Sequence, residues 1–282
     1  MKMRKLMALA GIAVLGGALA LFALAGCSST SSNADSAATS TSSSTSSITL
    51  TVGFDQDFPP YGYVGDDGQY TGFDLELAKE VCSRNGWTFK AQPINWDAKD
   101  MELSSGTINC IWNGFTINGR EDDYTWSDPY MDNSQVIVVR KDSGITKLSD
   151  LAGKNVMTQA ASAALTCLQD EEGQKALADT FGSLQTTPDY NTAFMELESG
   201  AVDAVAIDLP VAKYQLTEYG DIEILGEQLS QEQYGVGFLK GNTELRDQVE
   251  TTLKEMVSDG FVKQLCEKYA DQGITYDNWV MK

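Results

Sequence analysis

The sequence predicts an α/β fold made of two lobes with similar topology. Short apolar strands alternate with helical patterns along most of the chain, which is typical of βαβ units with mostly parallel sheets. Two segments also echo each other at an offset of 94 residues, Leu103–Ile111 (LSSGTINCI) and Leu197–Val205 (LESGAVDAV). Helix–glycine–strand junctions look alike by constraint, yet the 235 residues from Ile48 to Lys282 also divide naturally into two lobes. Ligands of such pairs bind in the cleft between the lobes.

The N-terminus resembles an export signal. Lys2, Arg4 and Lys5 precede an apolar run from Leu6 to Ala25, and a basic start followed by such a run is typical of secretory signals. The run is long enough to span a bilayer, so an uncleaved transmembrane anchor is the alternative. The next segment, residues 28–47, is almost wholly Ser, Thr, Ala, Asn and Asp, and is expected to be a flexible tether.

The remaining elements follow from hydrophobic periodicity. In the first half we expect strands at 48–54, 88–94 and 108–112 and helices at 73–85 and 99–105. A second series comprises strands at 135–139, 155–158 and 202–207 and helices at 163–171, 191–199 and 209–218. The chain is expected to close with a strand at 236–239 and helices at 244–258 and 261–269.

Composition excludes several classes of function. The chain has 20 basic and 40 acidic residues, and removal of the three basic residues of the signal gives a net charge of −23. Nucleic-acid binding needs a basic footprint and is therefore not expected. The chain has no histidine, which removes Ser-His-Asp triads and His-based metal sites. No metal, cofactor or catalytic residue is expected.

The cysteines match no zinc or redox spacing. After Cys27 the chain carries Cys82, Cys110, Cys167 and Cys266, each in an apolar stretch. An exported chain permits disulfides, so the sequence leaves open whether one bridge forms or all four are buried free thiols.

Several blocks together resemble the polar-amino-acid family (family 3) of solute-binding proteins that serve ABC importers. VGFDQDFPPYGY with GQYTGFDLELAKEV is similar to the family's opening strand, loop and first helix. LSSGTINCIWNGFTINGRE, followed by WSDPY, resembles its central signature, and DLAGKNVMTQAASAAL and FMELESGAVDAVAIDLPVA resemble its second-lobe motifs. The residues before Cys27, Leu24-Ala25-Gly26, resemble the lipobox of bacterial lipoproteins.

The resemblance implies a type II periplasmic-binding-protein fold, a Venus-flytrap that closes on its ligand by a hinge of two crossover segments. It implies a signal peptide over residues 1–26 and a lipidated Cys27 with its linker over 27–47. Residues 48–132 plus 235–282 would form lobe one and 133–234 lobe two, with crossings near 130–134 and 230–234. The expected protein is a monomer anchored outside the cytoplasm, and its partners are a free amino acid, a permease and an ATPase.

A buried amino acid needs partners for both of its charges. By the resemblance, Arg120 grips the carboxylate with its planar fork, helped by the Thr116 hydroxyl and by backbone amides near Gly114 and Thr116. The preceding residue Asn113 belongs to the same expected site. The block is one residue shorter here than the family pattern, at Asn118-Gly119.

The ammonium needs a carboxylate. Asp208, at the end of a predicted strand, matches the family's aspartate for this role, although an aspartate before Pro210 is also suited to capping the next helix. Asp55 matches a position that contacts either the ammonium or the ligand side chain, and ends of parallel strands are where such sheets bind ligands.

The second lobe and two aromatic residues complete the expected site. Gln159, Ser162 and Ala163 fill the family's ligand-binding turn, where Ser162 is suited to a carboxylate or to a helix cap. Gln159 stands where several members carry a basic residue, which argues against an acidic ligand and leaves glutamine or cystine among the candidates. Phe58 and Trp96 are the expected aromatic walls, and Trp112, Phe115 and Tyr61 are further candidates.

Two alternatives remain from sequence. Some relatives are cyclohexadienyl dehydratases, and fold does not fix function. A ligand-sensing module would bind in the same way and differ only in its membrane partner.

Overall fold

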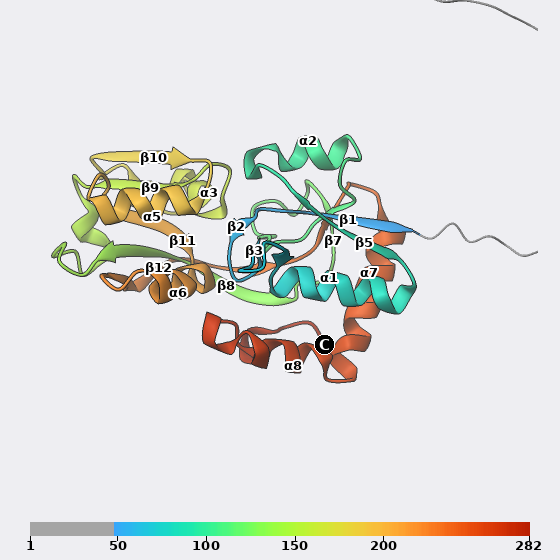
Figure 1. The fold of residues 1–282 in the computed structure, drawn as a ribbon. Coiled ribbons are helices and arrows are strands. Elements are labelled where there is room, and N and C mark those ends of the chain that lie inside the picture. The colour runs from blue at the N-terminus through green and yellow to red at the C-terminus, as the bar shows by residue number, and fades with distance from the viewer. Residues whose placement is uncertain (1–47) are drawn as a thin grey trace, which may run out of the picture. The chain divides into compact units, whose positions relative to one another are not determined.

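The computed structural model describes residues 48–282. The predicted signal, Cys27 and the linker lie outside these described residues. Two five-stranded sheets carry the architecture, and each is covered by helices of its own lobe (Figure 1). Within residues 48–282, no helix has the length and apolar character needed to cross a membrane.

The first sheet, with its helices, forms lobe one. Its strand order is β5-β1-β6-β13-β7, with bounds β1 (Thr49–Phe54), β5 (Thr88–Pro93), β6 (Cys110–Ile111), β7 (Thr125–Trp126) and β13 (Gly237–Phe238). Helices α1 (Phe73–Asn85), α2 (Lys99–Ser104), α7 (Thr243–Ser258) and α8 (Phe261–Lys268) belong to the same lobe. A small sheet of β2 (Asp57–Phe58), β3 (Gly62–Val64) and β4 (Tyr70–Thr71) lies between β1 and α1 in the chain.

The second sheet, with its helices, forms lobe two. Its order is β10-β9-β11-β8-β12, with bounds β8 (Met131–Arg140), β9 (Asn155–Gln159), β10 (Ser183–Thr187), β11 (Ala204–Asp208) and β12 (Ile222–Tyr234). Its helices are α3 (Ala163–Gln169), α4 (Lys175–Ala178), α5 (Tyr190–Ser199) and α6 (Leu209–Glu218). The 3-10 turns of the chain are η1 (Trp96–Ala98), η2 (Leu148–Leu151), η3 (Ala270–Gln272) and η4 (Tyr276–Asn278).

The two sheets share one topology. In each, three parallel strands are followed by two antiparallel neighbours: β5-β1-β6 and then β13-β7, β10-β9-β11 and then β8-β12. The repeated segment ends on β6 in one sheet and β11 in the other, the third strand of each order. The expectation of mostly parallel sheets is wrong, because two of the four strand pairs in each sheet are antiparallel. β8 and β13, the strands that the chain forms after each passage between the lobes, run against both of their neighbours.

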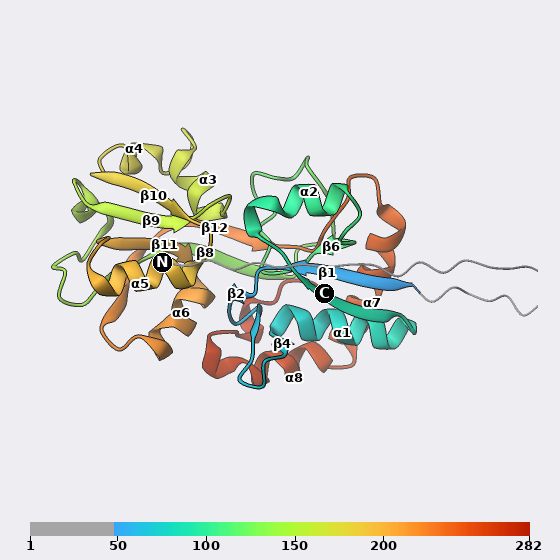
Figure 2. The same cartoon turned by 45° about the horizontal axis from the view of Figure 1, so that its top comes forward.

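The chain passes between the sheets twice. It leaves the first sheet after β7 and enters the second at β8, then returns from β12 to β13. β8 and β12 pair with each other as far as Met131 and Tyr234, and in Figure 2 both run from one lobe toward the other. Tyr234 also makes a bridge with Thr116 of lobe one. The two passages are therefore neighbouring, hydrogen-bonded strands.

The central strands of the second sheet, β8 and β11, are buried on both faces. Val136 and Val138 of β8 belong to the larger apolar core, whereas Ile137 and Val139 belong to the core beneath α3. This alternation follows from the two-residue period of a strand. A strand that is covered on both faces has an almost continuous run of apolar residues in its sequence.

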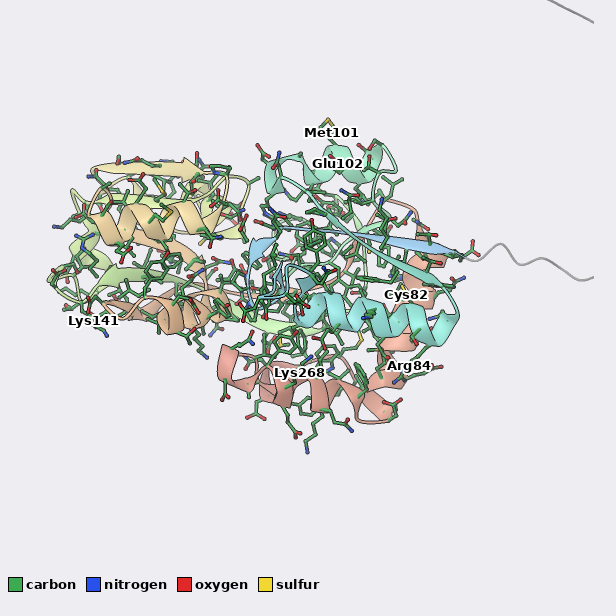
Figure 3. The ribbon with its side chains drawn as sticks, in the orientation of Figure 1. Cys82, Arg84, Met101, Glu102, Lys141 and Lys268 are labelled. Carbon is green, nitrogen blue, oxygen red and sulfur yellow. The ribbon has the colours of Figure 1, made fainter. Side chains whose placement is uncertain are left out.

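The cysteines of the described region are all free. Cys82 on α1 (Figure 3), Cys110 and Cys266 are buried, as the buried-thiol alternative expected, and Cys167 is partly exposed. Burial raises the pKa of the Cys82 thiol to about 11, which keeps it protonated and unreactive at neutral pH.

Candidate functional site

A cavity between the lobes gathers nearly all of the predicted site residues. Its volume, measured as the space open to the centre of a water molecule, is only about 10 Å³, so the lining side chains lie close together. Its lining consists of Phe58, Trp96, Asn113, Gly114, Thr116 and Arg120 from lobe one and Gln159, Ser162, Ala163 and Asp208 from lobe two. Of the eleven residues expected to hold the ligand, only Asp55 is outside this lining, and it is hydrogen-bonded to Gln159, which is inside it.

Arg120 brings a positive charge to this cavity. One guanidinium nitrogen donates to the Thr116 carbonyl and another to the Ala161 carbonyl, both at 3.2 Å. The guanidinium carbon also lies 5.3 Å from the centre of the Phe115 ring. Within residues 48–282 it forms no salt bridge. Since a guanidinium has five N–H donors, Arg120 keeps donors for an anion.

The shortened loop before Arg120 is a tight turn. The Arg120 N–H donates to the Ile117 carbonyl at 2.9 Å, and Gly119 has a φ of 78°, which glycine adopts without steric cost. The turn returns the chain so that Arg120 lines the cavity.

Two expected donors near Arg120 are already in use. The Gly114 N–H donates to Asp74 at 2.6 Å. The expectation that this N–H binds the ligand carboxylate is therefore wrong. The Thr116 hydroxyl donates to Glu232 at 2.8 Å, so toward the cavity its oxygen acts as an acceptor. The Thr116 N–H remains suited to a carboxylate, because Thr116 and Tyr234 form a bridge whose hydrogen bonds are made by the flanking residues.

Asp208 is an acceptor at the opposite side of the lining. Its Oδ1 accepts from Asn133 and Gln135 at 2.8 Å each and from the Tyr234 hydroxyl at 2.6 Å. Although it occupies the N-cap position of α6, its side chain makes no capping hydrogen bond. The helix-capping alternative is therefore wrong. Burial, and secondly Glu232, raise the pKa of Asp208 to about 7.

Asp55 and Gln159 join the two lobes. The Gln159 amide donates to Asp55 at 2.5 Å and to the Pro188 carbonyl at 2.9 Å. Asp55 also accepts from the Asp57 N–H at 2.9 Å. Burial raises the pKa of Asp55 to about 6. These bonds place a carboxylate from the end of β1 directly opposite the end of β9.

The turn before α3 combines a cap with an uncommon backbone conformation. The Ser162 hydroxyl accepts from the Leu165 N–H at 3.1 Å, so the N-cap alternative is confirmed; its hydroxyl still lies at the cavity. Ala161 has a φ of 56°, a left-handed conformation that is costly for residues with a Cβ. Its carbonyl is the one that accepts from Arg120.

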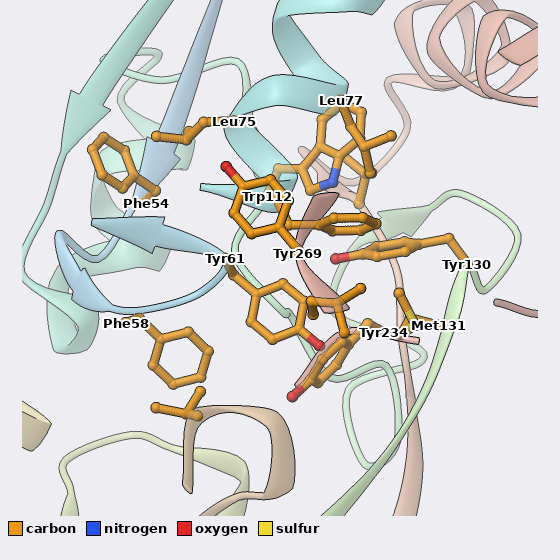
Figure 4. Packing of buried hydrophobic residues seen from close by; sticks show 14 of the residues in the cluster. Phe54, Phe58, Tyr61, Leu75, Leu77, Trp112, Tyr130, Met131, Tyr234 and Tyr269 are labelled. Carbon is orange, nitrogen blue, oxygen red and sulfur yellow. The ribbon is translucent and has the colours of Figure 1, made fainter. Parts of the chain in front are cut away.

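The aromatic walls are supported by a second layer of rings. Phe58 lies 6.0 Å from Tyr190 and 6.1 Å from Tyr61, centre to centre, and Figure 4 shows Tyr61 between Phe58 and Tyr234. Trp96 packs edge-on against Phe115 at 5.4 Å. Tyr61, Trp112 and Phe115 are fully buried and outside the lining, so these three candidates are core residues.

Asn113 is a buried polar group without a partner. Its side chain is 1% exposed, and neither its amide nitrogen nor its oxygen finds a hydrogen-bond partner in the described region. Such a group costs free energy unless something binds it. Because Asn113 lines the cavity, a polar ligand there would satisfy it.

Sequence reasoning missed the polar residues behind Asp208. Asn133 and Gln135 are buried and donate hydrogen bonds to Asp208, and both also donate to the buried Glu232. The sequence signal that could have found them is the pair of amide residues Asn133 and Gln135, which lie two positions apart at the start of an apolar strand. Among residues 48–282, no cluster of three or more potential ligands for a metal ion occurs.

The chain is similar in sequence and in structure to known proteins. Residues 50–272 match the model of the bacterial extracellular solute-binding proteins, family 3. The L-cystine-binding protein TcyJ of Escherichia coli strain K12 is 30% identical over 231 residues, covering 80% of this chain and 84% of the relative. The arginine-binding extracellular protein ArtP of Bacillus subtilis strain 168 is 28% identical over 254 residues, covering 88% of this chain and 92% of the relative. A solved structure of an ABC uptake transporter substrate-binding protein from Streptococcus pneumoniae with bound histidine has 32% identity and a TM-score of 0.75, covering 81% of this chain and 94% of that one.

Proposed function

The chain belongs to the bacterial extracellular solute-binding proteins, family 3, and we propose that it captures a free L-amino acid in the cavity between its lobes and delivers it to the permease of an ABC importer. The lobes would open and close about the paired strands β8 and β12. The proposal includes the domain limits expected from sequence, with lobe two spanning residues 133–234.

The charge pattern of the cavity is the observation that carries the proposal. Arg120 has free donors and no carboxylate partner in the described region, and Asp208 is a buried carboxylate on the other lobe. A zwitterion satisfies both, its carboxylate on Arg120 and its ammonium on Asp208. The Thr116 hydroxyl oxygen would accept from the same ammonium.

The same charges argue against an acidic ligand. Asp55, Asp208 and Glu232 are buried in or behind the cavity, whereas Arg120 is the cation in its lining. A ligand with an additional carboxylate would add like charge to this region. Glutamine and cystine are compatible with these charges, and so are arginine and histidine, the ligands named for two similar proteins. We propose Asp55 as the partner of the ligand's distal end.

The site assignment comprises Asp55, Phe58, Trp96, Asn113, Gly114, Thr116, Arg120, Gln159, Ser162, Ala163 and Asp208. Because the Gly114 N–H is bonded to Asp74, Gly114 is assigned a part in shaping the lining rather than the role of an N–H donor. No residue is assigned a catalytic role.

Thermal unfolding against a ligand panel tests the function. Full-length protein in mild detergent would be heated with each of the twenty amino acids and with L-cystine. A ligand at about 1,000 times its Kd stabilises the folded state by about 4 kcal/mol, which raises Tm by several degrees. A shift limited to one amino acid or a related group supports capture. A flat panel from folded, ligand-stripped protein would contradict it and favour the dehydratase alternative, tested by turnover of prephenate.

We also propose that Cys27 carries a lipid anchor. The lipobox-like Leu24-Ala25-Gly26-Cys27 ends an apolar run and is followed by a polar linker. Two acyl chains on one residue are enough for stable membrane attachment. Cys27→Ser should move the protein from the membrane fraction to the soluble fraction after expression, whereas Cys167→Ser should leave it in the membrane fraction. Retention of both variants in the membrane would instead support an uncleaved transmembrane segment.

A further inference from the structure

Behind the cavity, three neighbouring strands build a cluster of two carboxylates and two amides. β8 lies between β11 and β12. Gln135 of β8 is the register partner of Asp208, and Asn133 is the register partner of Glu232. Because Asn133 and Gln135 are two residues apart, their side chains leave the same face of the sheet. Both amides therefore lie between the two carboxylates.

Each amide nitrogen donates to both carboxylates. Asn133 Nδ2 lies 2.8 Å from Asp208 Oδ1 and 2.7 Å from Glu232 Oε1. Gln135 Nε2 lies 2.8 Å and 2.9 Å from the same two oxygens. The shared donors hold the two acidic oxygens close together in a fixed geometry.

The cluster has no cation of its own. Asp208 is 4% exposed and Glu232 7% exposed, and neither forms a salt bridge with a described residue. The side-chain amide oxygens of Asn133 and Gln135 are buried and have no hydrogen-bond partner within residues 48–282. Of the four cluster residues, Asp208 lines the cavity and offers its carboxylate there as an acceptor. The buried Glu232 carboxylate behind it makes the ionised form of Asp208 less favourable.

Lys213 of α6 and Asp132 of β8 line the outer groove that Glu232 also lines, but Lys213 forms no salt bridge within residues 48–282. On the cavity side, no described group supplies a positive charge to the Asp208–Glu232 pair either. Tyr234 faces Asp208 from β12, Tyr190 from α5 and Tyr61 from the loop after β2, and burial raises the pKa of each phenol, so all three stay neutral. Arg120 lines the same cavity but donates to carbonyl groups. Asp55 is a further buried carboxylate near the cavity, held by Gln159.

We propose that Asp208, beside the buried Glu232, holds a proton when no amino acid is bound and releases it when the ligand's ammonium group binds. The inference rests on the proposed function. The ligand enters with its ammonium fully protonated, Asp208 loses one H⁺ to water, and in the complex the ionised Asp208 carboxylate faces the ammonium with Glu232 behind it. Glu232 is then a positioning residue that acts through Asp208. It also lines a groove on the outer side of the lobe junction, which gives the proton a path to solvent.

Burial and the Glu232 charge, which raise the pKa of Asp208 to about 7, set the pH range of the effect. Ionised Asp208 is the form that binds the ammonium, so affinity should fall as pH drops through this value. For one proton released from a group with this pKa, Kd should rise about tenfold between pH 8 and pH 6.

Titration calorimetry on full-length protein measures the released proton directly. L-cystine, L-glutamine and L-arginine would each be titrated at pH 7 in two buffers with different ionisation enthalpies. For a probe that binds, we expect the heat to depend on buffer with a slope of about half a proton released. Binding with no buffer dependence and the same Kd at pH 6 and pH 8 would overturn the inference while leaving the proposed function intact. No binding of any amino acid would remove both.

A matched pair of variants identifies the source of the proton. Glu232→Gln removes the like charge but keeps an acceptor oxygen, so proton release at pH 7 should decrease and the affinity loss should move to lower pH. Glu223→Gln makes the same change at an exposed position of the same strand and should release as many protons as the wild type. Equal release from Glu232→Gln and wild type would assign the proton to another group, such as Asp55, and overturn the inference.

Discussion

At the scale of single residues, the environment of Arg120 explains how its guanidinium is held in position while some of its N–H donors stay free for a ligand. Two of its nitrogens are oriented by carbonyl groups, one from each lobe, and Phe115 supports its flat face. Neither kind of contact neutralises the charge. The guanidinium is therefore held in place while its remaining donors stay available.

Truncation of this side chain should abolish most of the affinity. Arg120→Ala leaves a desolvated ligand carboxylate without a partner, at a cost of about 3–5 kcal/mol, or roughly 10²–10³-fold or more in Kd. Calorimetry with the amino acid identified by the thermal panel measures the change. Arg84→Ala is the control, because Arg84 lies on α1 (Figure 3) and pairs with Glu80 and Asp259 at the surface. Wild-type affinity in Arg120→Ala would contradict the assignment of Arg120 to the ligand site.

The residue types of the site could be predicted, but not what each polar group is bonded to. The motifs placed Arg120, Asp208 and Gln159 at one cavity. They did not reveal that Gly114 donates to Asp74 or Thr116 to Glu232, since Asp74 and Glu232 are 40 and 116 positions away along the chain. Hydrogen bonds of this range depend on how the elements pack, and no local pattern encodes them.

At the scale of elements, periodicity identified the helices better than the strands. α1 and α6 begin and end where the apolar stripe predicted. β12, which spans Ile222–Tyr234, was not predicted, because its sequence is polar and its burial alternates irregularly around register shifts. The short strands β2, β3, β4 and β7 were also missed, since two or three residues carry no detectable period.

The turn that contains Gly114 joins β6 to the cavity and tolerates little change. Gly114 has a φ of 56°, and a Cβ there would lie 3.1 Å from Phe58 and 3.2 Å from both Tyr234 and Tyr61. Gly114→Ala should therefore lower the free energy of unfolding by about 1–3 kcal/mol and also weaken ligand binding.

Gly106→Ala separates backbone strain from crowding in this experiment. Gly106 has a φ of 77°, and a Cβ there would meet no atom within 4 Å. Both variants carry the cost of a left-handed residue, so urea unfolding should show a larger loss for Gly114→Ala. Only that variant should change Kd. Equal stability losses and equal affinities would mean that the aromatic residues around Gly114 rearrange freely.

At the scale of the whole molecule, buried carboxylates make stability depend on pH in an unusual direction. Burial raises the pKa of Asp55 to about 6 and the pKa values of Asp74 and Asp208 to about 7. Between about pH 4 and pH 7 the folded state therefore binds more protons than the unfolded chain, so stability decreases as pH rises. A carboxyl group that binds its proton ten times more tightly in the folded state contributes about 1.4 kcal/mol to this change. The excess of acidic residues acts in the same direction through self-repulsion.

Without ligand, Tm should be higher at pH 5 than at pH 8. Below pH 4 the trend should reverse, because Asp128 beside Lys254 and Asp259 beside Arg84 have lowered pKa values and lose these partners when protonated. Asp74→Asn should flatten the decrease between pH 5 and pH 8, because Asp74 is fully buried and an asparagine cannot titrate. A Tm that rises steadily from pH 5 to pH 8 in the wild type would contradict this account.

Ligand binding should show the opposite trend, because it needs an ionised Asp208. If the ammonium displaces a proton, the complex gains affinity as pH rises while the free protein loses stability. The increase in Tm caused by a fixed ligand concentration should therefore be larger at pH 8 than at pH 5.5, and a tenfold change in Kd corresponds to about 1.4 kcal/mol of ligand-induced stabilisation. Paired thermal scans with and without the amino acid, at both pH values, measure the difference. An increase in Tm of the same size at both pH values would show that capture does not depend on the ionisation of Asp208. The cluster of Asp208, Glu232, Asn133 and Gln135 would then act only in holding the strands β8, β11 and β12 together.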